Sequence, residues 1–307
     1  MITHYFRTLK DSGLKVYEAP RAGTWTHVVS PTDEELQQLE KEFGLDDAIL
    51  ADSKDFFEVP RFEYADMLSY FFVRYPFDEK HEDIDTAPLL IVMGESFVLT
   101  IAQREVPFLQ AFISGKKEMH TTQKTKLFLE FLRAMTASFE RELVRMRKVV
   151  YRNRTRVRNI RAQDIQRLVS YEHKLNDSIA AIVPTNAWLK QLAAGSYIHM
   201  FNEDMELMED LMIANSQLVD SSKSLLKTIQ NVRSATEAIL TQNLNTTIKL
   251  LTALTVILTI PTLISSFFGM NVPLPLMEHA YAFPMLVACT MLVMATVAYY
   301  FTKKRWF

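Results

Sequence analysis

The residues best suited to do chemistry in this sequence are hydroxyl groups inside a long uncharged run near the C-terminus. Residues 250–268 carry no charged side chain, yet they hold a row of six hydroxyl residues: Thr252, Thr255, Thr259, Thr262, Ser265 and Ser266. Spacings of three and four residues place most of this row on one face of a helix. Such hydroxyls either bond to backbone carbonyls and pack against a neighbouring helix, or line a hydrated path. The row by itself leaves both interpretations open.

Patterns typical of other chemistries are missing from the sequence. A single Cys excludes an internal disulfide framework and a cysteine-rich zinc site. The seven His are scattered without an HExxH pair, and Gly115-Lys116-Lys117 lacks the rest of a phosphate-binding loop. With 34 Lys and Arg against 36 Asp and Glu, the net charge of −2 argues against a nucleic-acid partner. A soluble enzyme is therefore the weakest functional interpretation.

Two segments near the C-terminus are long and apolar enough to cross a membrane. Residues 250–268 cover 19 positions, ~28 Å as a helix, and residues 280–301 cover 22 positions without a charge. Core helices of soluble proteins seldom run this long without a charged residue. We therefore predict transmembrane helices at 250–268 and 280–301, with a bend at Pro261, which removes one helical hydrogen bond.

The charges that flank these segments predict their orientation. The tail 302–307 carries Lys303, Lys304 and Arg305, whereas the connecting loop 269–279 contains no Lys or Arg. Because positive charge stays on the inner side, we expect a cytoplasmic C-terminus and an external loop. Two spans then place the N-terminus in the cytoplasm, in agreement with a first segment that lacks an apolar signal-peptide core. The predicted location is the plasma (inner) membrane, with lipid as a partner. Two helices cannot enclose a pore, so any pore needs several copies.

The part of the chain before the first span reads as an α+β protein. Residues 1–120 predict a cytoplasmic α/β domain, with candidate strands at 14–17, 24–29, 61–64, 68–74, 87–92 and 97–101. Between them, Ser30 and Pro31 predict a helix start and Gly44 a helix end. Residues 121–249 predict a helical bundle and stalk, because Gly195 is their only glycine. A basic run at 141–161 predicts a solvated face, paired with the acids at 203–210.

The stretch from Asn202 into the first span predicts one helix of ~100 Å. Apolar residues recur every seven positions at Leu211, Leu218, Leu225, Val232 and Ile239. The positions three residues on are small or polar: Ala214, Ser221, Thr228, Ala235 and Gln242. This pattern predicts half a coiled-coil seam and favours a ring of helices around a partly hydrated axis. We infer a stalk that couples the cytoplasmic domain to the first span.

The residues that close the first span, Ser266-Phe267-Phe268-Gly269-Met270-Asn271, resemble the Gly-Met-Asn signature of the CorA family of divalent-cation transporters. The preceding stretch NTTIKLLTALTVILTIPTLISSFF is similar to that family's first membrane helix, and the resemblance covers nearly the whole chain. It implies a funnel-shaped homopentamer with a central pore lined by the first span of each chain.

The resemblance also implies roles for individual residues. Gly269, Met270 and Asn271 would form the external selectivity filter, which binds a hydrated Mg²⁺ through its waters. Gly269 would permit a tight turn there. Asn245 would be a polar constriction, and Ile248 and Leu251 an apolar gate that closes by dewetting. The remaining pore-lining residues would be Thr255, Thr259 and Thr262. Asp52 and Asp210 would form a regulatory site for cytoplasmic Mg²⁺ between neighbouring subunits.

The sequence departs from the family in two places. The family's Met-Pro-Glu-Leu is replaced in the external loop, where this chain has NVPLPLMEHAYAFP and where Glu278 offers a substitute acid. Ala51 replaces the acid next to Asp52. We predict Mg²⁺ uptake, with Co²⁺ and Ni²⁺ as further candidate cargo. The alternatives are a Zn²⁺ transporter of the related ZntB type, mildly disfavoured because no His/Cys cluster offers soft ligands, and a membrane-anchored signalling protein.

Overall fold

The structure is a computed structural model of the 307-residue chain, and it describes residues 1–77, 86–154, 161–195, 197–271, 281–304 and 306. The chain divides into two compact units, Met1–Asn231 and Val232–Phe307. The predicted external loop at 269–279 falls largely outside the described residues, as do Glu278 and Arg305.

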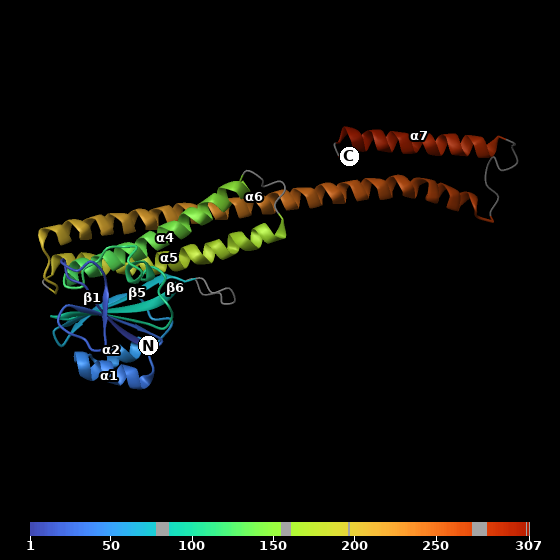
Figure 1. Ribbon diagram of the computed structural model, residues 1–307. Coiled ribbons are helices and arrows are strands. Elements are labelled where there is room, and N and C mark those ends of the chain that lie inside the picture. The colour runs from blue at the N-terminus through green and yellow to red at the C-terminus, as the bar shows by residue number, and fades with distance from the viewer. Residues whose placement is uncertain (78–85, 155–160, 196, 272–280, 305, 307) are drawn as a thin grey trace. The chain divides into compact units, whose positions relative to one another are not determined.

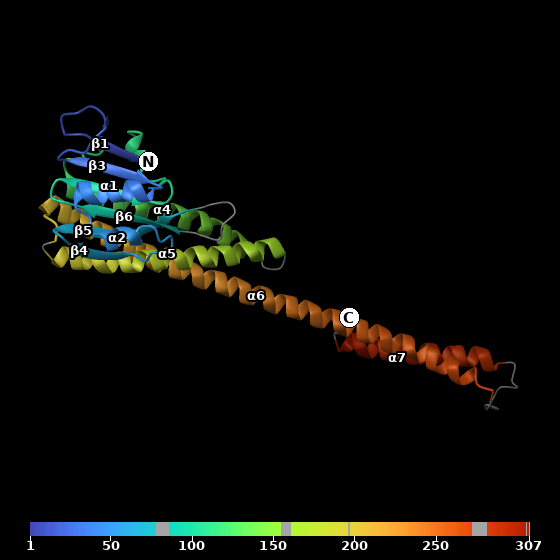
Figure 2. The ribbon, with the colours of Figure 1, turned by 90° about the horizontal axis from the view of Figure 1, so that it is seen from below.

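The first unit is built on a seven-stranded sheet in the order β2-β1-β3-β7-β6-β5-β4 (Figures 1 and 2). The strands are β1 (Ile2–Phe6), β2 (Lys15–Tyr17), β3 (Thr24–Val29), β4 (Arg61–Ala65), β5 (Leu68–Pro76), β6 (Thr86–Met93) and β7 (Phe97–Ala102). Neighbours pair antiparallel, except that β3 and β7 run parallel. Every residue of β6 is buried, which explains its unbroken apolar sequence. The six predicted strands are present, and β1 is an additional strand that the sequence patterns did not predict.

Helices cover both faces of this sheet (Figure 1). On one face, α1 (Asp33–Phe43) and α2 (Asp47–Asp52) contribute Leu36, Leu39 and Ile49 to a buried apolar cluster with the strands. On the other face lie α4 (Lys124–Arg154) and α5 (Ala162–Ala194), and the short helix α3 (Gln110–Ile113) precedes them. Aromatic rings join this second layer to the sheet, since Phe71 lies 4.4 Å from Phe128 and 5.2 Å from Trp188 between ring centroids.

The first helix begins two residues later than its sequence predicted. Thr32 is the N-cap, because its side chain accepts a hydrogen bond from the Glu35 amide while the Glu35 carboxylate accepts one from the Thr32 amide. Ser30 instead has a φ of 46° and donates its hydroxyl to the Gln103 carbonyl at 2.6 Å. The predicted cap at Ser30 was therefore wrong. The predicted end at Gly44 is confirmed, with Gly44 in the left-handed conformation at φ 66°.

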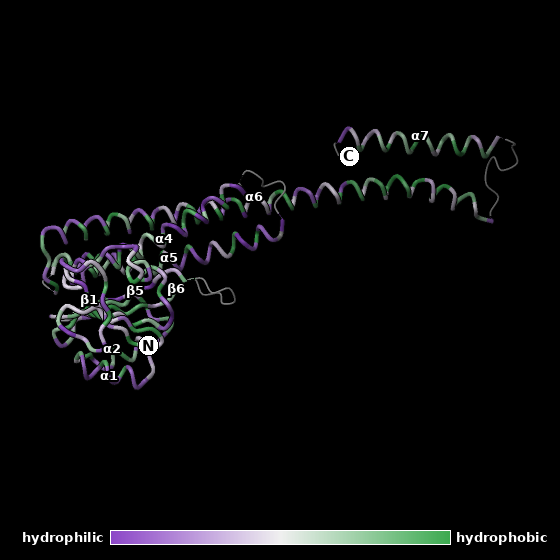
Figure 3. Tube along the Cα trace, viewed as in Figure 1, coloured by the Kyte–Doolittle hydropathy of each residue, from purple (hydrophilic) through white to green (hydrophobic). Residues whose placement is uncertain are grey.

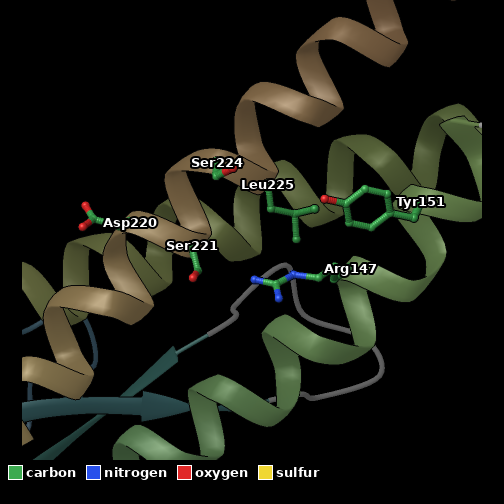
Figure 4. A pocket seen from close by; sticks show the side chains of 6 residues that line it. All are labelled: Arg147, Tyr151, Asp220, Ser221, Ser224 and Leu225. Carbon is green, nitrogen blue, oxygen red and sulfur yellow. The ribbon is translucent and has the colours of Figure 1, made fainter.

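The long helix α6 (Asn202–Phe268) packs its first part against α4 and α5 of the same chain. Lys126 pairs with Glu203 at 3.7 Å, and the Thr136 hydroxyl lies 2.8 Å from Asn215 Oδ1. These contacts show that α4 and α6 run parallel. Arg147 and Tyr151 accordingly lie beside residues 220–225 of α6, where the four helix residues and these two side chains line a pocket of about 280 Å³ (Figure 4).

For residues 141–154, the part of the basic run that lies in α4, this register contradicts the expected pairing with the acids at 203–210; residues 155–160 of the run lie outside the described residues. The basic end of α4 lies beside residues 220–225 of α6, which follow those acids by at least ten positions. Arg145 pairs with Glu142 of its own helix at 2.7 Å. Among the described residues, Lys126 near the start of α4 forms the ion pair with these acids, through Glu203. Sequence alone gave no information on how far α4 and α6 are offset.

The buried heptad positions of α6 also differ from the predicted ones. In the first unit, the buried row beside Leu211, Leu218 and Leu225 lies three residues earlier, at Met208, Asn215, Ser222 and then Ile229. Ala214, Ser221 and Thr228, the predicted partner row, are only half-buried. The seam therefore packs against helices of its own chain, and its interpretation as half of a seam around a hydrated axis was wrong here.

The second unit consists of the rest of α6 and the helix α7 (Ala282–Lys303). Both helices contain apolar windows long enough, by length and composition, to cross a membrane. Figure 3 shows the apolar character of both segments, and Figure 1 shows α7 running back alongside α6. Pro261 lies within α6 without ending it, and the ribbon bends in this last part of the helix (Figure 1).

Candidate functional site

The six predicted pore-lining residues all lie on α6 and are all exposed in the single chain. They are Asn245, Ile248, Leu251, Thr255, Thr259 and Thr262. At 100° per residue they fall within an arc of roughly 120° on the helix surface. We call this arc the hydroxyl face. It is wide enough to form one wall of a channel and narrow enough to leave the rest of α6 for packing.

The opposite side of α6 is the side that packs within the unit. Ala253 is fully buried, and the half-buried residues nearby are Ile257, Ile260, Pro261 and Ile264. This stripe lies roughly 180° from the hydroxyl face. Helix α7 has a matching half-buried stripe at Ala282, Leu286, Thr290, Met294, Val297, Ala298 and Phe301. Helix α7 runs alongside this part of α6 (Figure 1), and the least exposed side chains of the two helices lie on these stripes, whereas the hydroxyl face stays uncovered by the described residues.

The threonine hydroxyls of this face have a defined hydrogen-bond arrangement. Thr255 donates to the Leu251 carbonyl at 2.9 Å, Thr259 donates to the Thr255 carbonyl at 2.8 Å, and Thr262 donates to the Leu258 carbonyl at 3.1 Å. A hydroxyl has one proton and two acceptor lone pairs. Each of these groups can therefore satisfy its proton on the backbone while its oxygen still accepts a hydrogen bond from water. The two interpretations that the sequence left open are compatible with one another.

The predicted filter residues follow the end of α6 directly. The Gly269 amide donates to the Ser265 carbonyl at 3.0 Å, the Met270 amide donates to the Phe267 carbonyl at 3.3 Å, and Asn271 is exposed. The glycines with positive φ are Gly23, Gly44 and Gly115, so Gly269 does not adopt a conformation that only glycine favours. A Cβ at Gly269 would meet the Ser265 carbonyl oxygen at an ordinary 3.4 Å. The chain does turn at Gly269, directly after α6, but the backbone there is one that other residues can also adopt.

The two predicted sensor acids lie on different layers of the first unit. Asp52 is the last residue of α2, on one face of the sheet, whereas Asp210 belongs to α6, in the helix layer on the other face (Figure 1). The side chain of Asp210 is exposed and forms no hydrogen bond or ion pair with another described residue. No group of three or more His, Cys, Asp or Glu among the described residues is placed to hold a metal ion. A cation site that uses both acids requires a second copy of the chain.

Asp52 is engaged by a residue that the sequence did not single out. Its Oδ2 accepts a hydrogen bond from Arg61 Nη2 at 2.6 Å, and Arg61 also contacts the carboxylates of Glu58 and Glu63. Burial opposes the charge on Arg61, but the hydrogen bond to Glu63 and the charges of Glu58, Glu63 and Asp52 outweigh it and raise the pKa of Arg61. No sequence signal marks this group, because its members come from the end of α2, the segment that follows it, and β4, which the fold brings together.

Comparison with known proteins gives a consistent result. The sequence model of the CorA family, described as CorA-like Mg²⁺ transporter protein, matches residues 21–305. The chain is 25% identical over 299 residues to the cobalt/magnesium transport protein CorA of Methanocaldococcus jannaschii, in an alignment that covers 92% of this chain and 90% of that protein.

Solved structures show the same fold. The complete structure of the CorA magnesium transporter from Methanocaldococcus jannaschii superposes with a TM-score of 0.85 at 21% identity, covering 100% of this chain and 99% of that chain. The cytoplasmic domain of ZntB from Vibrio parahaemolyticus superposes with a TM-score of 0.63 at 10% identity, over 78% of this chain and 98% of that chain. These likenesses confirm the predicted α+β fold, with an N-terminal sheet domain, a long helix and a second apolar helix at the C-terminus.

Proposed function

Because the chain belongs to the family of CorA-like Mg²⁺ transporter proteins, we propose that it is a channel-like importer of Mg²⁺ in the plasma membrane, with Co²⁺ and Ni²⁺ as further cargo. The family consists of ion transporters and not of enzymes. The observation that carries the proposal is the uncovered hydroxyl face of α6, followed at its outer end by Asn271, with no charged residue between positions 250 and 271.

The pore is assembled from several copies, and a homopentamer is the proposed form. Each copy contributes its hydroxyl face to a central path, while the stripe at Ala253 and Ile257 holds α6 against α7. Mg²⁺ gives up its waters reluctantly, so the ion moves with much of its hydration shell. Those waters donate hydrogen bonds to the threonine oxygens, whose own protons are directed to backbone carbonyls.

Selection and closure are proposed at the two ends of this path. Gly269, Met270 and Asn271 form the external filter, where neutral amide and backbone oxygens bind the hydrated cation. At the inner end, Asn245 is a polar constriction, and Ile248 and Leu251 close the path by dewetting. Ile248 and Leu251 are 51% and 64% exposed in the single chain, as expected of side chains that would meet their copies around an axis.

The membrane potential supplies the driving force for uptake. Moving a divalent cation inward through 100 mV is worth about 4.6 kcal/mol. The cationic tail at Lys303 and Lys304 supports cytoplasmic N- and C-termini, with the filter on the external side. Cytoplasmic Mg²⁺ would bind between Asp52 of one subunit and Asp210 of the next. Relief of the repulsion between these carboxylates would hold the ring closed until the internal cation falls.

The test of the pore is the substitution Asn271→Ala in the full chain reconstituted in liposomes. We expect the loss of Mg²⁺ flux with the oligomer intact, because the ring of amides that binds the hydrated cation is removed. Asn243→Ala is the matched control, since Asn243 is an exposed asparagine of α6 on the side opposite the hydroxyl face. Flux at the unmodified level in Asn271→Ala would contradict the filter assignment.

The same assay separates the alternatives. Flux is measured with Mg²⁺, Co²⁺, Ni²⁺ and Zn²⁺ in parallel. Preference for Zn²⁺ over Mg²⁺ would favour a transporter of the ZntB type, and no flux of any of the four ions would favour a signalling role.

A further inference from the structure

We propose that Arg61 is a built-in competitor of the regulatory divalent cation at Asp52. The inference rests on the proposed sensor role of Asp52 and states how that site is regulated. It starts from the hydrogen bond that already occupies this carboxylate, between Arg61 Nη2 and Asp52 Oδ2 at 2.6 Å.

The guanidinium of Arg61 bonds to a different carboxylate through each of its three nitrogens. Nη2 donates to Asp52, Nη1 to Glu58 and Nε to Glu63. Its Cζ also lies 4.1 Å from the centre of the Phe72 ring, a distance suited to a cation–π contact. The side chain is fixed from several directions, and Asp52 is only one of its partners.

The exposure of the three carboxylates differs in a way that matters for exchange. The side chain of Asp52 is 49% exposed, against 39% for Glu63 and 13% for Glu58. A cation that arrives from solvent therefore reaches Asp52 more easily than it reaches Glu58. When it binds Asp52, the guanidinium gives up one contact and keeps Glu58, Glu63 and Phe72.

The local charge favours this exchange. Three carboxylates and one guanidinium give the group a net charge of −2, which attracts a divalent cation. The guanidinium nevertheless competes for Asp52 itself, so binding of the cation includes the cost of breaking the Arg61–Asp52 pair. Arg61 thereby lowers the affinity of the sensor and allows it to release its cation when the cytoplasmic concentration falls.

The inference is tested on the full chain by the substitution Arg61→Gln. Removing the competitor should lower the internal Mg²⁺ concentration that half-inhibits flux by about two- to five-fold, the range expected for one partly exposed ion pair. A second readout, independent of transport, is the Mg²⁺ concentration that half-maximally raises the thermal unfolding temperature of the detergent-solubilised oligomer. Both of these midpoint Mg²⁺ concentrations should decrease by a similar factor.

Two further variants keep the test decisive. Arg61→Ala removes the same guanidinium, so it should lower both midpoints as Arg61→Gln does, and it covers the case in which Arg61→Gln does not fold. Lys54→Gln is the matched control: it removes a cation that pairs with Asp33 at 2.6 Å, and it should leave both midpoints unchanged. Midpoints in the Gln and Ala variants equal to those of the unmodified protein would overturn the inference.

Asp52→Asn separates this inference from the proposed sensor. If Asp52→Asn leaves the Mg²⁺ response unchanged, Asp52 is not a sensor and the proposed regulation fails. If Asp52→Asn removes the response while Arg61→Gln leaves both midpoints in place, the sensor stands and only the competition by Arg61 fails.

Discussion

Individual side chains in the sheet link the stability of the first unit to pH. His27 lies in β3, is only 5% exposed, and has Nδ1 at 2.9 Å from the Thr100 hydroxyl. Burial lowers the pKa of His27 to about 4, and burial also lowers the pKa of His4, against the opposing charge of Glu42. The folded protein therefore holds His27 neutral at pH values where the unfolded chain takes up a proton.

We predict that the free energy of unfolding falls as the pH drops from about 6.5 to 4. Above pH 6.5 the contribution of His27 is fully present, and below it the unfolded state binds more protons, which costs about 3 kcal/mol by pH 4. Urea unfolding across this range, followed by the fluorescence of Trp25, whose ring lies 5.5 Å from that of His27, measures the slope. His27→Gln should flatten the slope without removing it, because His4 acts in the same direction. An unchanged slope in His27→Gln would contradict the assignment.

From the residue types, the chemistry of the site could be predicted, whereas the contacts between its side chains could not. The hydroxyl row was visible in the sequence because spacing alone defines one face of a helix. The hydrogen bond from Arg61 to Asp52 was not visible, because it depends on how the end of α2 lies against the first residue of β4. Likewise, Thr32 and not Ser30 caps α1, because the Ser30 hydroxyl donates its hydrogen bond to the Gln103 carbonyl.

Among the elements, α6 contains a buried polar position that weakens its packing. Asn215 is 1% exposed; its Oδ1 lies 2.8 Å from the Thr136 hydroxyl, and its Nδ2 has no partner among the described residues. Trp188 Nε1 and Asn186 Oδ1, on the adjacent helix α5, are also buried without a partner there. A buried polar atom without a partner opposes folding.

We predict that Asn215→Leu stabilises the first unit by about 1 kcal/mol. The substitution removes an unpaired donor and places an apolar side chain in the seam beside Leu218, while the Thr136 hydroxyl can still donate to the Leu132 carbonyl at 3.0 Å. Leu218→Ala, at a neighbouring buried position, should instead destabilise by about 2–5 kcal/mol. Thermal unfolding of the two variants checks the prediction, and a lower unfolding temperature for Asn215→Leu would refute it.

The elements with strong local patterns were predicted well, and those set by tertiary pairing were not. Six strands were recognised from their apolar and β-branched runs, whereas β1 was missed because ITHYF mixes polar and aromatic residues without an apolar run. Its strand conformation comes from pairing with β2 and β3 on either side. The heptad of α6 was recognised, but its second buried row was misplaced, since the partners are α4 and α5 and not copies of α6.

On the scale of the whole molecule, the proposed sensor exists only between copies. The sheet separates Asp52 from Asp210 within a chain, so any joint site reports assembly as well as cation concentration. We predict that Asp210→Lys weakens the inhibition of flux by internal Mg²⁺, because the new cation repels Mg²⁺ and removes a carboxylate. Liposome flux at graded internal Mg²⁺ measures this, with Asp220→Lys as control at another exposed acid of α6. Full inhibition at unchanged Mg²⁺ in Asp210→Lys would exclude Asp210 from the sensor.

The threonine hydroxyls of the hydroxyl face donate their protons to the α6 backbone, and this affects whether the path admits cations or anions. Chloride is stabilised by hydrogen-bond donors, and the protons of Thr255, Thr259 and Thr262 are already directed to carbonyls of α6. A wall built from these side chains offers a passing ion only the negative ends of its hydroxyl dipoles. It would therefore discriminate between anions and cations without a single carboxylate, and the path could stay uncharged, so that a divalent cation is admitted without being held.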